Sequence, residues 1–148
     1  KRNALKQTKS TQQNQLPKDF SRNKENSLNA FLNYGYQILL STFNKEIVAN
    51  GYLTQIGLFH KNMFNYYNLS SDLMEPFRVI IDELAYKENP QKFEKDEKRK
   101  LQNILNFKYR INENNHYLSE VIKIYTKSIF DALNSNDLSL VRFFSDEL

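Results

Sequence analysis

The chain has 148 residues, of which 40% are hydrophobic and 14% are aromatic. That is enough for one domain with a hydrophobic core, and it excludes a disordered composition. Cysteine is absent, which excludes disulfides, zinc–cysteine sites and thiol catalysis and favours a cytoplasmic protein. The formal net charge of +4 permits nucleic acid as a partner without requiring one.

No apolar run approaches the roughly 18 residues that a membrane span needs, so we expect no membrane partner. With only three glycines, the chain cannot form a Gly-rich phosphate loop or a dinucleotide fingerprint. Its first residue is Lys rather than Met, which suggests a fragment or a processed chain.

Residues 1–18 are rich in Lys, Gln and Asn and contain no acidic residue. This composition predicts a basic polar arm or a weak, degenerate first helix. We expect residues 19–148 to form a single helical domain, because their apolar residues follow helical spacing.

Residues 26–50 form the clearest predicted helix. Asn26 or Ser27 is expected to cap its start, and Asn50-Gly51 to end it. Gly35 lies inside the pattern and is expected to let another backbone approach closely. Residues three or four apart make one buried face, namely Leu28, Phe31, Leu32, Gly35, Leu39, Phe43 and Ile47.

Further along, a connector is predicted at residues 52–68. A second helix is expected to start near Ser70 or Ser71, with Pro76 in its first turn or marking a kink just after it, and to end at Asn89-Pro90. A charged helix at residues 93–106 would follow.

A polar turn is predicted after the charged helix, with a short extended piece at residues 107–111. The last strong helix would carry apolar residues from Leu118 to Leu133, and an apolar tail at residues 138–144 would dock on the bundle. No strand besides the short piece is predicted, so the expected class is all-α.

The most distinctive chemistry lies at residues 60–78. His60 is one of two histidines, and Asp72 and Glu75, three residues apart, would share one face of a helix. Imidazole and carboxylate groups are ligands for Mg(II) or Mn(II). Arg78, one turn later, could clamp a phosphate. The pattern indicates a divalent-metal site for phosphate chemistry.

The same residues also have a purely structural interpretation. Asp72-Leu-Met-Glu75 is a D-x-x-E capping box, which would satisfy the amides at a helix start. A single histidine near aromatic residues is commonly a hydrogen-bonded surface residue. Spacing alone leaves the metal site and the cap both open.

The amino-acid identities, beyond their spacing, also resemble a known family. Residues 29–36 read N-A-F-L-N-Y-G-Y, residues 54–60 read T-Q-I-G-L-F-H, and residues 68–78 read N-L-S-S-D-L-M-E-P-F-R, followed by Asp82. In this order and spacing they resemble the CRISPR-associated spacer-acquisition integrases, the Cas1 family, of type II flavour. The D-F-S-R sequence at residues 19–22 is similar to another box of that family.

The resemblance implies a helical catalytic domain that lacks the family's N-terminal β domain. It implies a metal-dependent DNA endonuclease and integrase that uses Mg(II) or Mn(II). In the reaction so implied, the 3′-hydroxyl of prespacer DNA attacks a phosphodiester at the end of a CRISPR repeat. The implied partners are DNA, a second copy in a homodimer, and the second core CRISPR adaptation protein.

The resemblance also assigns roles to residues. His60 matches the family's metal-binding histidine and Glu75 its downstream acid, so both are implied to be catalytic. Asp72 matches the neighbouring acidic position in the metal site. We expect Arg78, Lys61 and Arg22 to contact DNA phosphates.

The family's first metal-binding glutamate has no match, because Ala4 occupies its position. The glutamate was substituted, the N-terminal region diverged, or the chain starts after the true glutamate. Each explanation predicts an incomplete site and poor or absent catalysis by this chain alone. The alternatives are a non-catalytic helical module that dimerises or docks with adaptation partners, and a plain helical scaffold.

Several other polar and aromatic residues are expected to be structural. The tyrosines at positions 34, 36, 66 and 67 should pack in the core rather than stack on bases. His116 should lie on the surface at a helix start. Lysines and Arg99 in residues 92–100 alternate with acidic residues, which predicts a solvated helix face.

Overall fold

The computed structural model describes residues 22–145, with side chains described from residue 26. The basic arm predicted at residues 1–18 therefore lies outside the described residues. The elements in chain order are α1 Arg22–Ala49, α2 Asn68–Met74, the 3₁₀ turn η1 Glu75–Phe77, α3 Arg78–Glu88, α4 Lys95–Gln102, η2 Asn103–Asn106, β1 Lys108–Ile111, β2 Asn114–Tyr117, α5 Leu118–Ser135 and η3 Leu138–Leu140.

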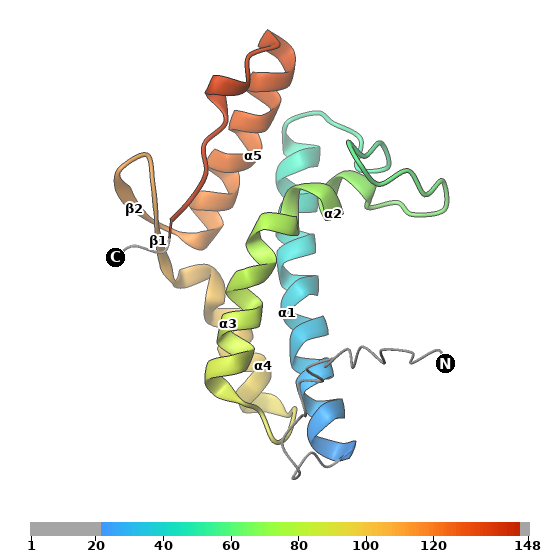
Figure 1. Cartoon of the computed structure of the whole chain (residues 1–148), viewed down its shortest axis with the longest axis vertical. Coiled ribbons are helices and arrows are strands. Elements are labelled where there is room, and N and C mark those ends of the chain that lie inside the picture. Colours follow the sequence, from blue (N-terminus) through green and yellow to red (C-terminus); the bar gives the residue numbers. More distant parts are fainter. Residues whose placement is uncertain (1–21, 146–148) are drawn as a thin grey trace, which may run out of the picture.

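The long helix α1 is the centre of the molecule (Figure 1). Helices α3 and α4 lie beside its N-terminal half, and α5 lies beside its C-terminal half. The rings of Phe43, Phe77 and Tyr125 meet where α1, η1 and α5 converge, with centroids 5.0, 6.2 and 5.1 Å apart. Edge-on and tilted aromatic contacts of this kind stabilise a core beyond the area they bury.

The predicted buried face of α1 is confirmed, since Phe31, Leu39, Phe43 and Ile47 have no exposed surface. The helix begins at Arg22, however, so the expected caps at Asn26 and Ser27 are wrong: both lie inside it. The predicted stop is confirmed, because Gly51 has a φ of 83° and the Asn50 amide bonds back to the carbonyl oxygen of Glu46. A left-handed residue just after a helix is a common C-terminal cap.

Gly35 allows a close approach, but by side chains rather than by a backbone. A Cβ atom at this position would lie 2.6 Å from Cγ2 of Ile81 and 3.2 Å from Cδ2 of Leu101. Both neighbours are fully buried. The glycine therefore lets α3 and α4 pack against α1 at the same level.

The second predicted helix forms two helices with a 3₁₀ turn between them. It starts at Asn68 rather than at Ser70 or Ser71. Pro76 lies in that turn, so it marks the kink, as expected of a residue without an N–H. Helix α3 ends as predicted, with Asn89 in the left-handed conformation at a φ of 42°.

A small β-hairpin makes the strictly all-α prediction wrong, although the described chain is mostly helical. Strands β1 and β2 pair antiparallel, with Ile111 opposite Asn114. The two turn residues, Asn112 and Glu113, both have positive φ, which is the conformation of a two-residue type I′ turn. His116 lies in β2 rather than at a helix start.

The C-terminal tail docks on the bundle, as predicted. The Phe144 ring lies 4.4 Å from that of Phe77, and Arg110 and Ser145 exchange two backbone hydrogen bonds. This bridge ties the end of the described chain to the hairpin. Among residues 22–145, no helix has the length and apolarity to cross a membrane.

Candidate functional site

The loop between α1 and α2 carries His60, and two buried side chains hold it together. The hydroxyl of Thr54 donates to the carbonyl oxygen of Tyr66 at 2.7 Å. The amide group of Asn68, 2% exposed, donates to the carbonyl oxygens of Gln55 at 2.9 Å and Asn62 at 2.7 Å. These bonds join the two ends of the loop, which makes it a preorganised structure.

Asp72 lies under this loop and is the centre of its polar contacts. Its side chain is 2% exposed. One oxygen, Oδ2, accepts the amides of Leu58 at 2.6 Å and Phe59 at 2.9 Å. The other, Oδ1, accepts the amide of His60 at 3.2 Å and also contacts its Nδ1. A carboxylate that accepts several donors is well compensated for burial.

Electrostatics at Asp72 follow from these contacts. Burial alone would raise the pKa of its carboxyl group, but hydrogen bonds from the amides of Phe59, His60 and Leu58 and from the His60 ring outweigh burial and lower the pKa. Asp72 is therefore a carboxylate at neutral pH.

The capping-box interpretation of Asp72 is wrong. Asp72 is the fifth residue of α2, which begins at Asn68 and has no side-chain capping bond. Its oxygens bond loop amides that lie 12 to 14 residues away in sequence.

Gly57 is required where the loop passes over Asp72. A Cβ atom at this position would lie 2.3 Å from the carbonyl oxygen of His60 and 2.8 Å from Oδ2 of Asp72. Gly57, Thr54 and Asn68 were not predicted as site residues. Gly57 lies within the T-Q-I-G-L-F-H stretch and Asn68 begins the N-L-S-S-D stretch, so both could have been found there.

His60 is held by one ring nitrogen and presents the other. Its side chain is 53% exposed, and Nδ1 contacts the buried Asp72 carboxylate. A carboxylate that accepts the Nδ1 proton leaves the lone pair on Nε2, the arrangement in which histidine binds a metal. The contact with Asp72 holds the ring in orientation and favours the tautomer with the proton on Nδ1.

Glu75 belongs to a second pair of residues. Its carboxylate is 61% exposed and contacts Nη1 of Arg78 at 3.2 Å. The guanidinium of Arg78 in turn lies over the ring of Tyr36, with Cζ 4.4 Å from the centroid. The structure therefore brings His60 together with Asp72, and Glu75 together with Arg78.

The imidazole of His60 and the nearby carboxylates are suitable ligands for a divalent cation, but too few of them lie together in the described residues. Imidazole and carboxylate groups suit Mg(II) or Mn(II). Within residues 22–145, however, no three His, Cys, Asp or Glu side chains are arranged to hold a metal ion. Ala4, which occupies the position of the missing glutamate, lies outside the described residues.

The two other predicted DNA contacts are only partly described. Lys61 is exposed beside His60. Arg22 is the first residue of α1, and its side chain lies outside the described part of the chain.

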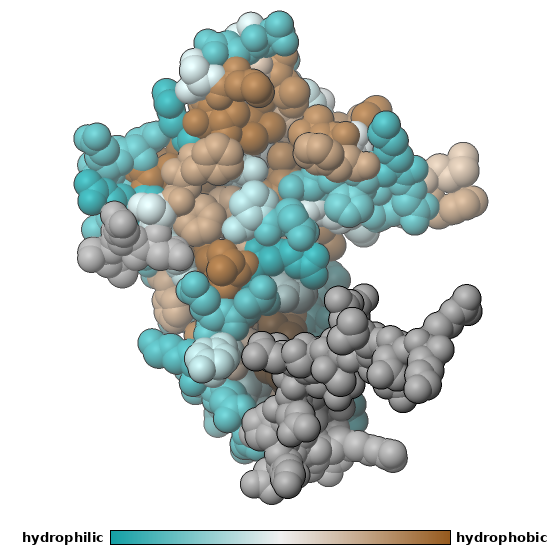
Figure 2. Space-filling view, viewed as in Figure 1, coloured by the Kyte–Doolittle hydropathy of each residue, from teal (hydrophilic) through white to brown (hydrophobic). Residues whose placement is uncertain are grey.

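Apolar side chains project from the same loop. Phe59, Met63 and Phe64 are 84%, 86% and 84% exposed, and Figure 2 shows apolar groups at the tip of this projection next to hydrophilic ones. Tyr66 and Tyr67 are exposed as well, so their predicted packing in the core is wrong. The core placement is confirmed only for Tyr34 and Tyr36, which pack against it partly buried.

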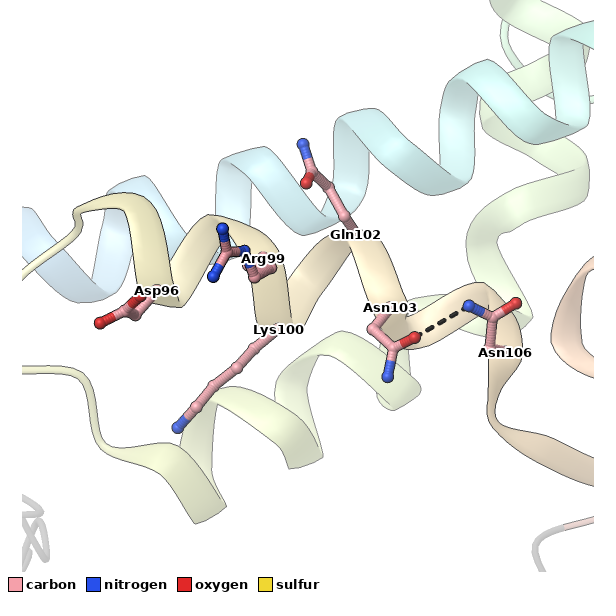
Figure 3. Close-up of a pocket in the computed structure, with 6 residues that line it drawn as sticks. All are labelled: Asp96, Arg99, Lys100, Gln102, Asn103 and Asn106. Carbon is pink, nitrogen blue, oxygen red and sulfur yellow. Dashed lines mark hydrogen bonds between the residues drawn. The ribbon is translucent and has the colours of Figure 1, made fainter.

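A surface pocket on α4 and η2 lies away from this loop and has mixed charge. Asp96, Arg99 and Lys100 line it with three amide side chains, and the Asn106 amide donates a hydrogen bond to the Asn103 side chain (Figure 3). Lys100 is paired with Glu88. The predicted solvated helix face is confirmed, because the basic residues of the stretch are all exposed, namely Lys92, Lys95, Lys98, Arg99 and Lys100.

The chain is similar to proteins of one known family. A family model described as CRISPR associated protein Cas1 matches residues 10–112. A CRISPR-associated endonuclease Cas1 from Neisseria meningitidis is 40% identical over 63 residues, which are 43% of this chain and 21% of that protein. CRISPR-associated protein Cas1 3 from Methanobrevibacter ruminantium is 40% identical over 78 residues, covering 48% of this chain and 23% of that protein.

A solved structure of a casposase bound to integration product has a similar fold. The TM-score is 0.64 at 25% sequence identity, and the match covers 74% of this chain and 38% of the casposase chain. The chain spans about a fifth of the length of the curated relatives it matches.

Proposed function

The chain belongs to the Cas1 family of CRISPR-associated proteins, and from this premise we propose that it acts on DNA in CRISPR adaptation as part of an integrase or endonuclease. The observation that carries the proposal is His60, oriented by the buried Asp72 and exposed at the surface of a preorganised loop. The buried carboxylate holds the ring by Nδ1, which leaves Nε2 as the ring nitrogen that could bind a metal ion.

DNA is the substrate class that we propose. The structural neighbour is a casposase bound to integration product, and one curated relative is named an endonuclease. In the proposed reaction a DNA 3′-hydroxyl attacks a phosphodiester at a CRISPR repeat. The attacking hydroxyl oxygen loses its proton and forms a new bond to phosphorus. The bond from phosphorus to the 3′-oxygen of the repeat breaks, and that displaced oxygen takes up a proton. Lys61 and Arg78 would hold the phosphates by charge.

For the metal, we propose Nε2 of His60 and the carboxylate of Glu75 as ligands. When bound, Mg(II) or Mn(II) would supply Lewis-acid stabilisation of the phosphate oxygens. Because both oxygens of Asp72 already accept loop donors, we propose that Asp72 orients His60 from behind rather than binding the ion itself. Two ligands are too few for a tight site, so weak metal binding is expected.

The test is thermal unfolding with increasing Mn(II) for the wild type, His60→Ala, Glu75→Ala and the control Glu83→Ala. Glu83 is an exposed glutamate of α3. At ten times the Kd, binding adds about 1.4 kcal/mol of stability. We expect this gain in the wild type and the control, and its loss in the other two variants. If the wild type gains nothing, or if Glu83→Ala loses as much as Glu75→Ala, the metal proposal fails.

Cleavage of linear and branched DNA in Mn(II) tests the activity. Because the first glutamate is unmatched, we expect weak or absent cleavage by this chain alone. Robust cleavage that His60→Ala abolishes would instead show a complete site.

The exposed loop favours a second candidate function. Phe59, Met63 and Phe64 are a surface that a non-catalytic module could use to dimerise or to dock the second core adaptation protein. Sedimentation and binding to that protein, compared between the wild type and Phe64→Ser, test this. Association lost in the variant supports the docking module, whereas a monomer that binds no partner contradicts it.

A further inference from the structure

The guanidinium of Arg78 has two anchors on different elements. One is the carboxylate of Glu75, three residues earlier, at 3.2 Å from Nη1. The other is the ring of Tyr36 on α1, whose centroid lies 4.4 Å from Cζ. A cation within about 6 Å of a ring centroid is attracted by the ring face. The first anchor is local in sequence, and the second joins α3 to α1.

The Tyr36 ring is itself fixed. Its hydroxyl contacts Oδ1 of Asp82, which lies one turn beyond Arg78 on α3. Burial raises the pKa of Tyr36, and the hydrogen bond to Asp82 raises it further, so the hydroxyl stays protonated and donates. Tyr36, Arg78 and Asp82 thus form a chain of contacts between α1 and α3, with Glu75 at its end.

We infer that Tyr36 is a positioning residue, whose ring fixes the Arg78 guanidinium beside Glu75 and toward a DNA phosphate, with Asp82 fixing the ring. The inference rests on the proposed function, because it assigns Arg78 to DNA. The sequence predicted only that Arg78 clamps a phosphate; the role of Tyr36 in positioning Arg78 is new.

The geometry gives this arrangement a specific use. The side chain of Arg78 is 40% exposed, and guanidinium has five N–H donors in one plane. Stacking on the Tyr36 ring fixes the guanidinium plane and leaves the N–H groups at its edge to donate hydrogen bonds to phosphate oxygens. If Glu75 turned toward another partner, Arg78 would keep its second anchor on Tyr36. An arginine held only by Glu75 would be released.

Tyr34 provides a matched control on the same helix. It is also partly buried against the core, and its hydroxyl accepts a hydrogen bond from Gln102 at 2.9 Å. Its ring packs edge-on against Phe93. Replacing Tyr34 by Leu therefore disturbs packing to a similar degree but leaves the contact between Arg78 and the Tyr36 ring intact.

The first experiment measures the position of Arg78 without DNA. In NMR spectra of arginine-labelled protein, the Tyr36 ring current should shift the Arg78 side-chain protons upfield. Tyr36→Leu should remove this shift, Tyr36→Phe should keep most of it, and Tyr34→Leu should leave it unchanged. Arg78 signals that do not respond to Tyr36→Leu would overturn the inference.

The second experiment measures DNA binding by fluorescence anisotropy as a function of salt. Arg78→Ala should reduce the slope of log K against log salt by about 0.9, since one phosphate contact is lost. Tyr36→Leu should weaken binding about two- to fivefold. Tyr36→Phe keeps the ring but loses the hydroxyl contact with Asp82, so it should weaken binding less than Tyr36→Leu does, and Tyr34→Leu should bind as the wild type does.

A double-mutant cycle decides whether Tyr36 acts through Arg78. In the Arg78→Ala background, Tyr36→Leu should weaken binding no further. Equal effects of Tyr36→Leu with and without Arg78 would overturn the positioning role. A wild type without salt-dependent DNA binding would overturn the proposed function instead, and the NMR shift would then still decide whether Tyr36 positions Arg78.

Discussion

At the residue scale, one buried carboxylate determines the shape of the loop that carries His60. Asp72 accepts three consecutive loop amides and contacts the His60 ring. An ionised group so deeply buried would be costly without donors, so the loop and the carboxylate stabilise each other. Gly57 belongs to the same unit, because any side chain there would meet the His60 carbonyl oxygen.

Asp72→Ala is expected to lower the free energy of unfolding by about 1.5–3 kcal/mol at neutral pH, since charge-assisted hydrogen bonds are lost and three amides are left to water. The folded-state pKa of Asp72 lies below its ordinary value of 3.8. The stabilising contribution is therefore complete above that value and is lost as the pH falls through the lower folded-state pKa.

Urea unfolding of the wild type and Asp72→Ala between pH 7 and pH 3 measures this contribution. The difference in stability should be constant near neutrality and shrink at the acidic end of the series. Asp131→Ala is the control, because Asp131 is an exposed aspartate of α5 paired with Lys127 and should change stability by less than about 1 kcal/mol. A difference that grows on acidification would contradict the assignment.

At the element scale, α1 organises the fold because α2, α3, α4 and α5 all pack against it. At Gly35 the helices pack closely, because Ile81 and Leu101 occupy the space that a side chain would need. The kink at Pro76 then turns the chain from α2 into α3. It places Glu75 and Arg78 at the junction, next to Tyr36 of α1.

Gly35→Ala is expected to destabilise the fold by about 1–2 kcal/mol. Overpacking by one methyl group costs about 1–3 kcal/mol, and the better helix propensity of alanine offsets up to about 1 kcal/mol of it. Asn33→Ala, at an exposed position of the same helix, should be neutral or slightly stabilising. Calorimetry or denaturant unfolding checks both variants, and a more stable Gly35→Ala protein would show that α3 and α4 can retreat.

At the scale of the whole molecule, the C-terminal tail joins the hairpin to the helical core. Phe144 contacts Phe77 of η1 and Tyr109 of β1, and the bridge between Arg110 and Ser145 runs alongside. The tail therefore closes the molecule on the side of α5 and the hairpin (Figure 1).

Phe144→Ala is expected to lower the free energy of unfolding by about 2 kcal/mol, because a half-buried ring and two aromatic contacts are lost. Phe143→Ala is the matched control. Its ring is 67% exposed and should contribute less than about 1 kcal/mol. Equal losses in the two variants, measured by denaturant unfolding, would mean that the tail does not dock through Phe144.

Much of the fold could be predicted because helical spacing is local. The apolar face of α1, the Asn50-Gly51 stop and the course of α5 follow from residues within a few turns of one another. Strand β2 was missed because Asn-Asn-His-Tyr has neither apolar alternation nor β-branched residues. It forms through its pairing with β1 and its two-residue turn.

The candidate site was predicted less completely, for a physical reason. The residues around His60 and Glu75 identify the family, but the sequence does not give the distances between their side chains. The Thr54 and Asn68 contacts that build the loop were not foreseen, since each is made to backbone carbonyls rather than to a recognisable side-chain partner.

The sequence by itself determined the helical periodicity, the family and the residue types available for metal and phosphate. Only the tertiary structure decided which of those residues meet. Asp72 pairs with His60 rather than capping α2, and Arg78 lies between Glu75 and Tyr36. The path of the loop and the packing of α3 on α1 set these pairings. Neither can be predicted from the local spacing of these residues, because both depend on contacts between segments far apart in the sequence.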